Sequence, residues 1–590
     1  MILSRLAACA ILIAAAYPLS AVCEEGNVKD AAPQAAIEAS ALPAPSPEAS
    51  SGEGVMSIHE QVDPARSALP ARDENTHLRL KLDTIELEEL YEALRQEVQR
   101  DSVRMSLREC VALTLEGNQD ILVTEYAPWK AEADIFAARG EFDPIASGTM
   151  NYTKAEKSMS AEVVRYGGLP RLEIWNTTGQ ASVGGKLPWG TQYGVALDMS
   201  KEETPYNNYV EEWTGSLSLN ITQPLLRGRG KAVNLARIRI AANSRAQSES
   251  QVRIQAMSSV ADVVRAYWDL VGTIQAVEVR KQSLENAERL LEINEKRREI
   301  EVGSGMEVVQ AKAGVATRQS ELISARSTVF DAEDQLKNLM SMKDGGRLSG
   351  VHIVPIEQPS TADVELAEEQ SIELALSKRP EINAAELAID SAEIQRHAAA
   401  NDLQPQLDVT GSLSQGGRGH YASDVFDGIK ERDDNAYSIG LKGAVSLGNK
   451  AARGAYQRTK LEKREAQQRL EKTQQDIMTT VRMAVRNVAT SRILVESNKQ
   501  ARRLQETNVD AGEKRLKLGV ITSFELLRLQ EDLAMAQLQE LQSLINYEKA
   551  LVDLRLAEGV LLEELGVAFD LAEAEQPVTY IRSLYPIDPH

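Results

Sequence analysis

Hydrophobic and polar residues alternate in several segments of the chain, whereas elsewhere the apolar residues recur in steps of three and four. The alternating segments lie at residues 146–153, 216–222, 407–414 and 437–446. Alternation with period two gives a β-strand one apolar and one polar face. Near-heptad spacing in residues 267–291 and 527–556 is typical of helices that pack as coiled coils. The pattern therefore predicts antiparallel strands and long packed helices, a mixed α and β fold.

The same order of elements occurs twice along the chain. Residues 110–116 (CVALTLE) match residues 371–377 (SIELALS), and the same offset places Pro144 on Pro405. Each half predicts a pair of helices, then strands, then two long helices. Such a half buries little apolar surface alone, so we expect it to need its twin and further copies of the chain.

The two halves differ in length between corresponding positions. Pro144 and Glu307 are 163 residues apart, whereas Pro405 and Glu525 are 120 apart, so the first half carries 43 extra residues. The extra residues alternate in polarity around a Pro-Trp-Gly turn, which predicts a β-hairpin at about 160–205. The pattern leaves open whether this hairpin joins the main sheet.

Two segments without proline, residues 231–300 and 450–518, predict helices of unusual length. Each holds about 70 residues, or roughly 105 Å at 1.5 Å per residue. This length exceeds an ordinary domain and suits a protein that crosses a compartment. Each helix ends in a turn before a second long helix returns, and the turn residues include Gly303, Ser304, Gly519 and Thr522.

A glutamate follows each turn, and two explanations remain open for it. Ser304 with Glu307, and Thr522 with Glu525, have the spacing of a capping box, in which the two residues cap a helix start. If symmetry placed copies of the turns around an axis, the same glutamates would form carboxylate rings, which select cations. Arg528 lies one helical turn beyond Glu525 on the same face, and we expect the two to pair.

Composition and charge narrow the functional class. Aromatic residues make up 4 % of the chain, as expected of long helices rather than a thick globular core, and the net charge of −21 argues against a nucleic-acid partner. The six histidines are scattered without metal-ligand spacing, and no catalytic or nucleotide-binding motif occurs. We therefore expect neither an enzyme nor a bound cofactor or metal.

The ends of the chain have compositions of their own. Residues 1–23 resemble a signal peptide, with lipid attachment at Cys23 as a weaker alternative, and the Ala/Pro/Ser-rich residues 24–75 predict a disordered linker. Residues 76–105 are helix-compatible and lie outside the repeat, and residues 566–590 form a C-terminal tail. Cleavage of the signal peptide would leave Cys110 alone, so we expect a buried apolar residue there rather than a disulfide.

The strand segments have features of a membrane protein. No run of 18 apolar residues occurs, so a membrane crossing would use β-strands. Residues 140–226 and 405–447, about a fifth of the chain, hold 12 of its 26 aromatic residues. Aromatic girdles and strands of about ten alternating residues are typical of outer-membrane barrels. A transmembrane antiparallel sheet is therefore favoured over a soluble sheet with one wet face.

Several short motifs then occur in a specific order. They are Leu107–Leu113, Gln223–Gly228 (QPLLRG), Ala266–Leu270 (AYWDL) and Gln370–Leu376. In this order the motifs resemble those of the TolC family of outer-membrane efflux proteins. The resemblance covers two repeats, residues 106–341 and 366–565.

The resemblance implies a homotrimer in the cell outer membrane, with a large periplasmic portion. In such a trimer, four strands per chain would form a shared twelve-stranded transmembrane β-barrel, continuous with a trimeric α-helical barrel of long antiparallel helices. If the extra hairpin joined the wall, the barrel would grow toward eighteen strands; following the family, we expect twelve. The implied function is a passive exit duct of a tripartite efflux or type I secretion system.

The resemblance also implies partners and a gate. The partners are a periplasmic adaptor protein, which would contact the helix turns, an inner-membrane pump and outer-membrane lipid. In the family, two acidic residues three apart near the second turn form gate rings; Glu525 matches the first, and Arg528 stands in place of the second. The alternative is a secreted or periplasmic coiled-coil structural or adaptor protein without a membrane barrel.

Overall fold

The computed structural model describes eight segments of the chain. They are residues 79–82, 102–165, 170–205, 210–301, 303–340, 351–360, 367–432 and 434–570. The predicted signal peptide, the predicted linker and the tail beyond residue 570 lie outside these segments. The chain divides into two compact units, and all described residues belong to the unit His77–Ala572.

A pair of helices opens each half of the repeat, as predicted. The pairs are α3 (Leu107–Gly117) with α4 (Gln119–Arg139), and α9 (Glu368–Lys378) with α10 (Pro380–Asn401). The repeat extends to packing, because Cys110 and Thr114 of α3 are buried, and so are their counterparts Ser371 and Ala375 of α9. Equivalent residues therefore face equivalent interiors in the two halves.

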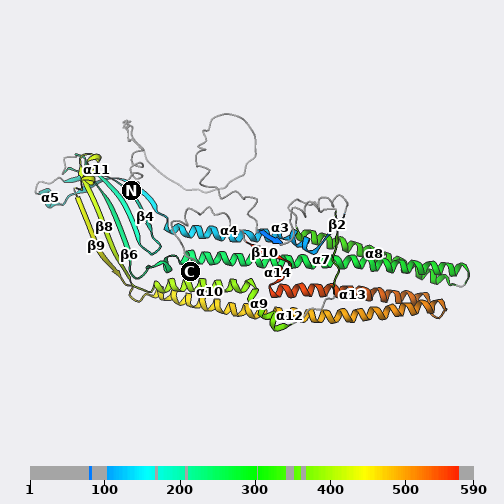
Figure 1. The fold of residues 1–590 in the computed structure, drawn as a ribbon. Helices are drawn as coiled ribbons and strands as arrows, with labels where there is room; N and C mark the ends of the chain where they lie inside the picture. Colours follow the sequence, from blue (N-terminus) through cyan, green and yellow to red (C-terminus); the bar gives the residue numbers. More distant parts are fainter. Residues whose placement is uncertain are drawn as a thin grey trace, which may run out of the picture. The chain divides into compact units, whose positions relative to one another are not determined.

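The predicted long helices are present and follow the strands in each half. They are α7 (Ala236–Glu299) with α8 (Gly305–Met340), and α12 (Lys450–Lys517) with α13 (Ser523–Glu558). Figure 1 shows them running side by side away from the sheet. Five short helices complete the described part of the chain: η2 (Gly140–Phe142), α5 (Ala161–Arg165), α6 (Lys231–Asn234), α11 (Ala422–Glu431) and α14 (Leu561–Glu564).

One antiparallel sheet contains all the predicted alternating strands. Its order is β3-β4-β5-β6-β8-β9. The strands are β3 (Ile145–Ser158), β4 (Arg171–Lys186), β5 (Gln192–Glu203), β6 (Glu212–Pro224), β8 (Gln406–Gly419) and β9 (Asp434–Ala444). The hairpin of the 43 extra residues is β4–β5, and it lies between β3 and β6. The sheet therefore has six strands instead of the four expected per chain, because β4 and β5 are inserted between β3 and β6.

One face of this sheet is mainly apolar and the opposite face is polar, from the first strand to the last. On one face, aligned across five strands, lie Met150, Gly179, Met199, Gly215 and Gly417. Neighbouring rows of this face contain leucine, valine and isoleucine. The opposite face is polar, with side-chain hydrogen bonds of 2.7 Å between adjacent strands at Ser147–Ser182, Gln180–Asp198 and Ser412–Ser438.

Helix α11 lies on the apolar face, at the end of β6 and β8 away from the long helices. Val425 of α11 is fully buried over two glycines. A Cβ atom on Gly417 would lie 2.4 Å from the Val425 carbonyl oxygen, and one on Gly215 would lie 2.8 Å from Val425 Cγ1. Only glycine allows the helix to approach the strands this closely.

Two small sheets connect distant parts of the chain. β1 (Arg79–Leu82) pairs antiparallel with β10 (Val567–Asp570), and β2 (Ser102–Met105) pairs parallel with β7 (His352–Pro355). Residues 76–105 were predicted to be helical. The two described parts of this segment, residues 79–82 and 102–105, are strands, so the prediction is wrong there. Backbone partners more than 200 residues away satisfy the peptide groups there, and local helix propensity does not reveal such partners.

The main core surrounds the middle of α7. Tyr267 is fully buried, and its hydroxyl accepts hydrogen bonds from the backbone N–H groups of Ile356 (3.1 Å) and Glu357 (3.2 Å) and donates to the Glu357 carboxylate. Burial and this carboxylate raise the pKa of Tyr267. Cys110 packs in the same core as a buried free thiol, as predicted, and burial raises its pKa.

Tyr267→Phe should destabilise this core. The substitution leaves the Glu357 N–H without its acceptor, which costs about 1–3 kcal/mol, whereas the Ile356 N–H keeps the Met105 carbonyl at 3.2 Å. Tyr456→Phe is the matched control, because among the residues the structure describes that hydroxyl accepts a single bond of 3.4 Å, from Arg396. Thermal unfolding in detergent, followed by circular dichroism, should show a lower midpoint for Tyr267→Phe alone. Equal midpoints would show that the Tyr267 hydroxyl does not hold β7 in place.

Candidate functional site

The two turns between the long helices lie at the same end of the unit (Figure 1). In the second turn Gly519 has a φ of +69° and donates its N–H to the Leu516 carbonyl at 3.0 Å, while Val520 donates to Arg515 at 2.9 Å. This left-handed glycine ends α12 by satisfying its last carbonyl groups. In the first turn Gly303 donates to the Arg297 carbonyl at 2.9 Å, and a Cβ on Gly303 would lie 3.1 Å from Arg297.

The second turn contains the predicted capping box. The Thr522 hydroxyl accepts from the Glu525 N–H at 3.2 Å, and the Glu525 carboxylate accepts from the Thr522 N–H at 3.0 Å. The first turn has an ordinary N-cap in place of the predicted capping box. Ser304 Oγ accepts from the Met306 N–H at 3.2 Å, and no bond from Ser304 to the Glu307 carboxylate occurs among the described residues.

Glu525 and Arg528 do not pair within the chain. Both side chains are exposed, and the ion pairs of the described residues include none between them. The reason is the cap: the Glu525 carboxylate turns back toward Thr522, before the helix start, whereas Arg528 lies one turn further along. The expected intrachain contact between Glu525 and Arg528 is therefore not formed.

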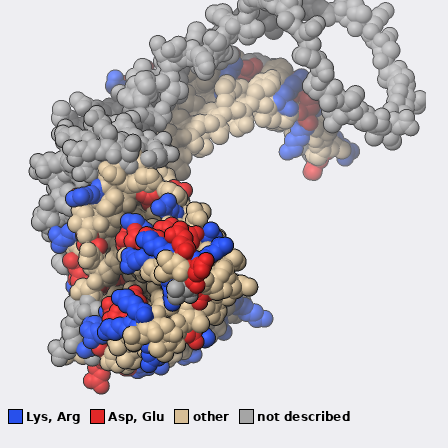
Figure 2. All heavy atoms as spheres, turned by 90° about the vertical axis from the view of Figure 1, so that its right-hand side faces the viewer, with Lys and Arg blue, Asp and Glu red and all other residues tan. Residues whose placement is uncertain are grey.

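Charges at this end of the unit follow the helix dipoles. Basic residues close the outgoing helices, and acidic residues open the returning ones, which is the favourable order for both helix ends. The basic residues are Lys296, Arg297, Arg298, Lys514, Arg515 and Lys517, and the acidic ones are Glu307 and Glu525. Figure 2 looks onto this end and shows both signs of charge close together, with uncharged surface between them.

The opposite face of the α13 start is buried and carries polar links that the sequence analysis missed. Ser523 Oγ of α13 donates to Asn294 Oδ1 of α7 at 2.8 Å, and both residues are buried. Arg318 of α8, also buried, donates to the backbone carbonyl of Leu527 at 3.2 Å. These bonds join the α7–α8 hairpin to the α12–α13 hairpin.

A signal for these links was present in the pattern of the helices. Ala287, Leu290 and Asn294 are buried at steps of three and four, so Asn294 occupies a core position of the heptad stripe. Arg318 stands likewise between buried Ala311 and Leu322. A polar residue at a core position indicates a specific contact between helices, although it does not identify the partner.

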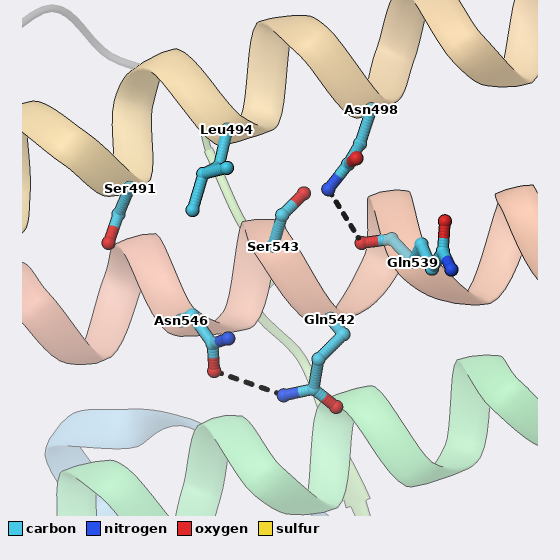
Figure 3. A pocket seen from close by; sticks show the side chains of 7 residues that line it. All are labelled: Ser491, Leu494, Asn498, Gln539, Gln542, Ser543 and Asn546. Carbon is cyan, nitrogen blue, oxygen red and sulfur yellow. Dashed lines mark hydrogen bonds between the residues drawn. The ribbon is translucent and has the colours of Figure 1, made fainter.

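A hollow between α12 and α13 is lined mainly by amides and serines (Figure 3). Asn498 Nδ2 donates to the Gln539 carbonyl at 3.4 Å, and Gln542 Nε2 donates to Asn546 Oδ1 at 3.0 Å. The amides thus bond to each other and to the helix backbone. This arrangement is explained by helix packing.

Comparison with known proteins now identifies the family. A model of the family described as outer membrane efflux protein matches residues 111–341 and 371–560, which is more than half of the chain. The chain belongs to the outer membrane efflux protein family. It is therefore a channel-type protein of the outer membrane. A search of the curated proteins found no match.

Solved structures share the fold at low sequence identity. The Campylobacter jejuni CmeC outer membrane channel has 15 % identity and a TM-score of 0.57, covering 89 % of this chain and 95 % of that chain. The Vibrio cholerae outer membrane protein VceC has 19 % identity and a TM-score of 0.55, covering 79 % and 97 %. The open state of the Neisseria gonorrhoeae MtrE outer membrane channel has 15 % identity and a TM-score of 0.51, covering 77 % and 89 %.

Within the described part of the chain, no helix combines the length and the apolar character needed to span a lipid bilayer.

Ser523→Ala should weaken the link between the two helical hairpins. The Nδ2 of the buried Asn294 carboxamide has no partner within the described segments, so the substitution removes the carboxamide's remaining bond there, at a cost of about 1–3 kcal/mol. Replacing both partners, as Asn294→Leu with Ser523→Ala, should restore much of the stability because no polar group is then left unpaired. Hydrogen–deuterium exchange at residues 523–530 measures the effect. Exchange that is no faster in Ser523→Ala than in the double variant contradicts the link.

Proposed function

We propose that three copies of this chain form the outer-membrane exit duct of a tripartite efflux or type I secretion system. The observation that carries the proposal is the sheet, which has one apolar face continuing to both edges. The outermost strands have strongly exposed apolar residues, among them Met150 and Tyr152 on β3 and Tyr437, Ile439 and Leu441 on β9. A face of this kind suits contact with lipid, and the polar face suits a water-filled lumen.

The helix turns are the proposed contact for a periplasmic adaptor protein, which would connect the duct to an inner-membrane pump. Apolar residues next to the turns are exposed to solvent. The turns are those of Gly303, Ser304, Gly519 and Thr522. The exposed apolar residues are Ile300, Met306, Val309, Leu518, Val520 and Phe524. Exposed apolar residues with charges close by are typical of a protein interface.

The start of α13 is the proposed gate. Threefold symmetry would place three copies of Glu525 around the axis, close to Arg528 of the same or the next copy, and Glu307 would lie at the neighbouring helix start. Carboxylates concentrated at a constriction attract cations, because Coulomb interactions strengthen where water is scarce. In this arrangement Glu525 both caps α13 and selects ions.

Fractionation tests the duct. We expect an outer-membrane species of trimeric mass in mild detergent, whose gel mobility changes on heating. Val520→Asp at the tip should leave the trimer intact and abolish export, because a charge disrupts the apolar adaptor contact. A soluble periplasmic protein of monomeric mass would favour the alternative of a coiled-coil structural protein.

Glu525→Gln separates the gate from the cap. The amide oxygen still accepts the Thr522 N–H, so the thermal midpoint should hold, whereas the loss of three charges at the constriction should lower cation selectivity in planar bilayers. Glu531→Gln, an exposed acid further along α13, serves as the control and should change neither quantity. Wild-type selectivity and conductance in Glu525→Gln would mean that Glu525 is only a helix cap.

A further inference from the structure

The insertion of the β4–β5 hairpin changes the number of strands that each chain contributes to the proposed barrel wall. The hairpin does not lie beside the sheet, because β4 pairs along the whole length of β3 and β5 pairs with β6 over residues 192–202. Six strands alternate in direction, so β3 and β9 run antiparallel to each other at the two edges. Copies arranged head to tail can therefore join β9 of one to β3 of the next, and every neighbour in the wall remains antiparallel.

We propose that β9 of each copy pairs with β3 of the next, closing an eighteen-stranded barrel in place of the twelve expected from the family. This inference rests on the proposed trimer. Within the described residues the outer edges of β3 and β9 have no strand partner. Such edges cannot lie unpaired in hydrocarbon, because each unsatisfied backbone group there costs several kcal/mol.

The lengths of the strands restrict how the edges can meet. Following the registered pairs across the sheet from Ile145 of β3 leads through Gly184, Gly194, Asn220 and Ser412 to Ser438 of β9. If all of β9 (Asp434–Ala444) is to pair within β3 of the next copy, Ser438 must lie opposite one of residues 151–154. Strand length thus excludes an unstaggered closure.

The faces of the strands restrict the register further. Ser438 is on the polar face, and between residues 147 and 153 of β3 that face carries the odd-numbered residues Ser147, Thr149, Asn151 and Thr153. Apolar and polar faces therefore match across the junction only if Ser438 lies opposite Asn151 or Thr153. A shift by one residue would bring the apolar face of one copy into line with the polar face of the next.

These two registers agree with the geometry of closed barrels. They correspond to a stagger of six or eight residues per copy relative to Ile145. At a strand spacing near 4.8 Å, three such copies give strand tilts of roughly 35° or 43°, within the range of membrane barrels. The backbone diameter is then roughly 35 Å, against roughly 24 Å for twelve strands at similar tilt. The exit through the membrane is correspondingly wider.

Cysteine cross-linking tests the junction in the full-length protein in outer membranes. Ser438→Cys is combined with Asn151→Cys in one variant and with Thr153→Cys in another. We expect oxidation to move one of the two from the monomer band to covalent dimers and trimers on a denaturing gel, because opposite residues in a strand pair are close enough for a disulfide. The single-cysteine variants control for the native cysteines and should stay monomeric.

Two further variants locate the hairpin. Ser147→Cys with Ser182→Cys should close a disulfide within one chain, since the serine oxygens are 2.7 Å apart. Asn151→Cys with Ser218→Cys joins β3 to β6, which touch only if the hairpin leaves the wall, and it should not cross-link. A cross-link in this last variant overturns the inference, as does a trimer without any β3–β9 cross-link. Absence of the trimer itself overturns the proposed function.

Discussion

The pairing of backbone groups at the strand edges is the constraint on which the rest of this molecule depends. A sheet with one apolar and one polar face can separate lipid from water only when both of its edges are covered. Within the described residues, one chain supplies six strands and two unpaired edges. In the proposed trimer, neighbouring copies cover these edges, and the helices that continue from the strands repeat around the same axis as the strands do.

Within one chain, specific contacts between α7 and α13 hold the two halves of the repeat together. Arg265 of α7 forms an ion pair of 2.6 Å with Asp553 of α13, and Lys549 pairs with Asp269 one turn further along. Gly272 lets α13 approach α7, since a Cβ atom there would lie 3.0 Å from Ile545 Cγ1. Apolar packing sets the distance between the hairpins, and these partly exposed ion pairs fix their register more than their stability.

Much of the fold could be predicted from periodicity. The helix pairs, the long helices and the alternating strands all follow from local patterns, and the capping box at Thr522 and Glu525 is a local pattern too. What failed depends on partners far away in sequence. Residues 79–82 form a strand because residues 567–570 pair with them. The position of the β4–β5 hairpin depends likewise on which strands pair with it. The sequence of the hairpin alone does not determine that β3 and β6 are its neighbours.

The cap at the start of α13 and the proposed gate make different demands on Glu525, and the helix dipole reconciles them. Its buried face, with Ser523 and Leu527, is bound to α7 and α8, while Glu525 and Arg528 remain on the exposed side. A carboxylate at a helix N-terminus is stabilised by the unpaired N–H groups there. Carboxylates gathered around an axis repel one another, and each helix start offsets part of that repulsion. A glutamate that caps a helix is thus stabilised by that helix, which lowers the electrostatic free energy of gathering such carboxylates at a constriction.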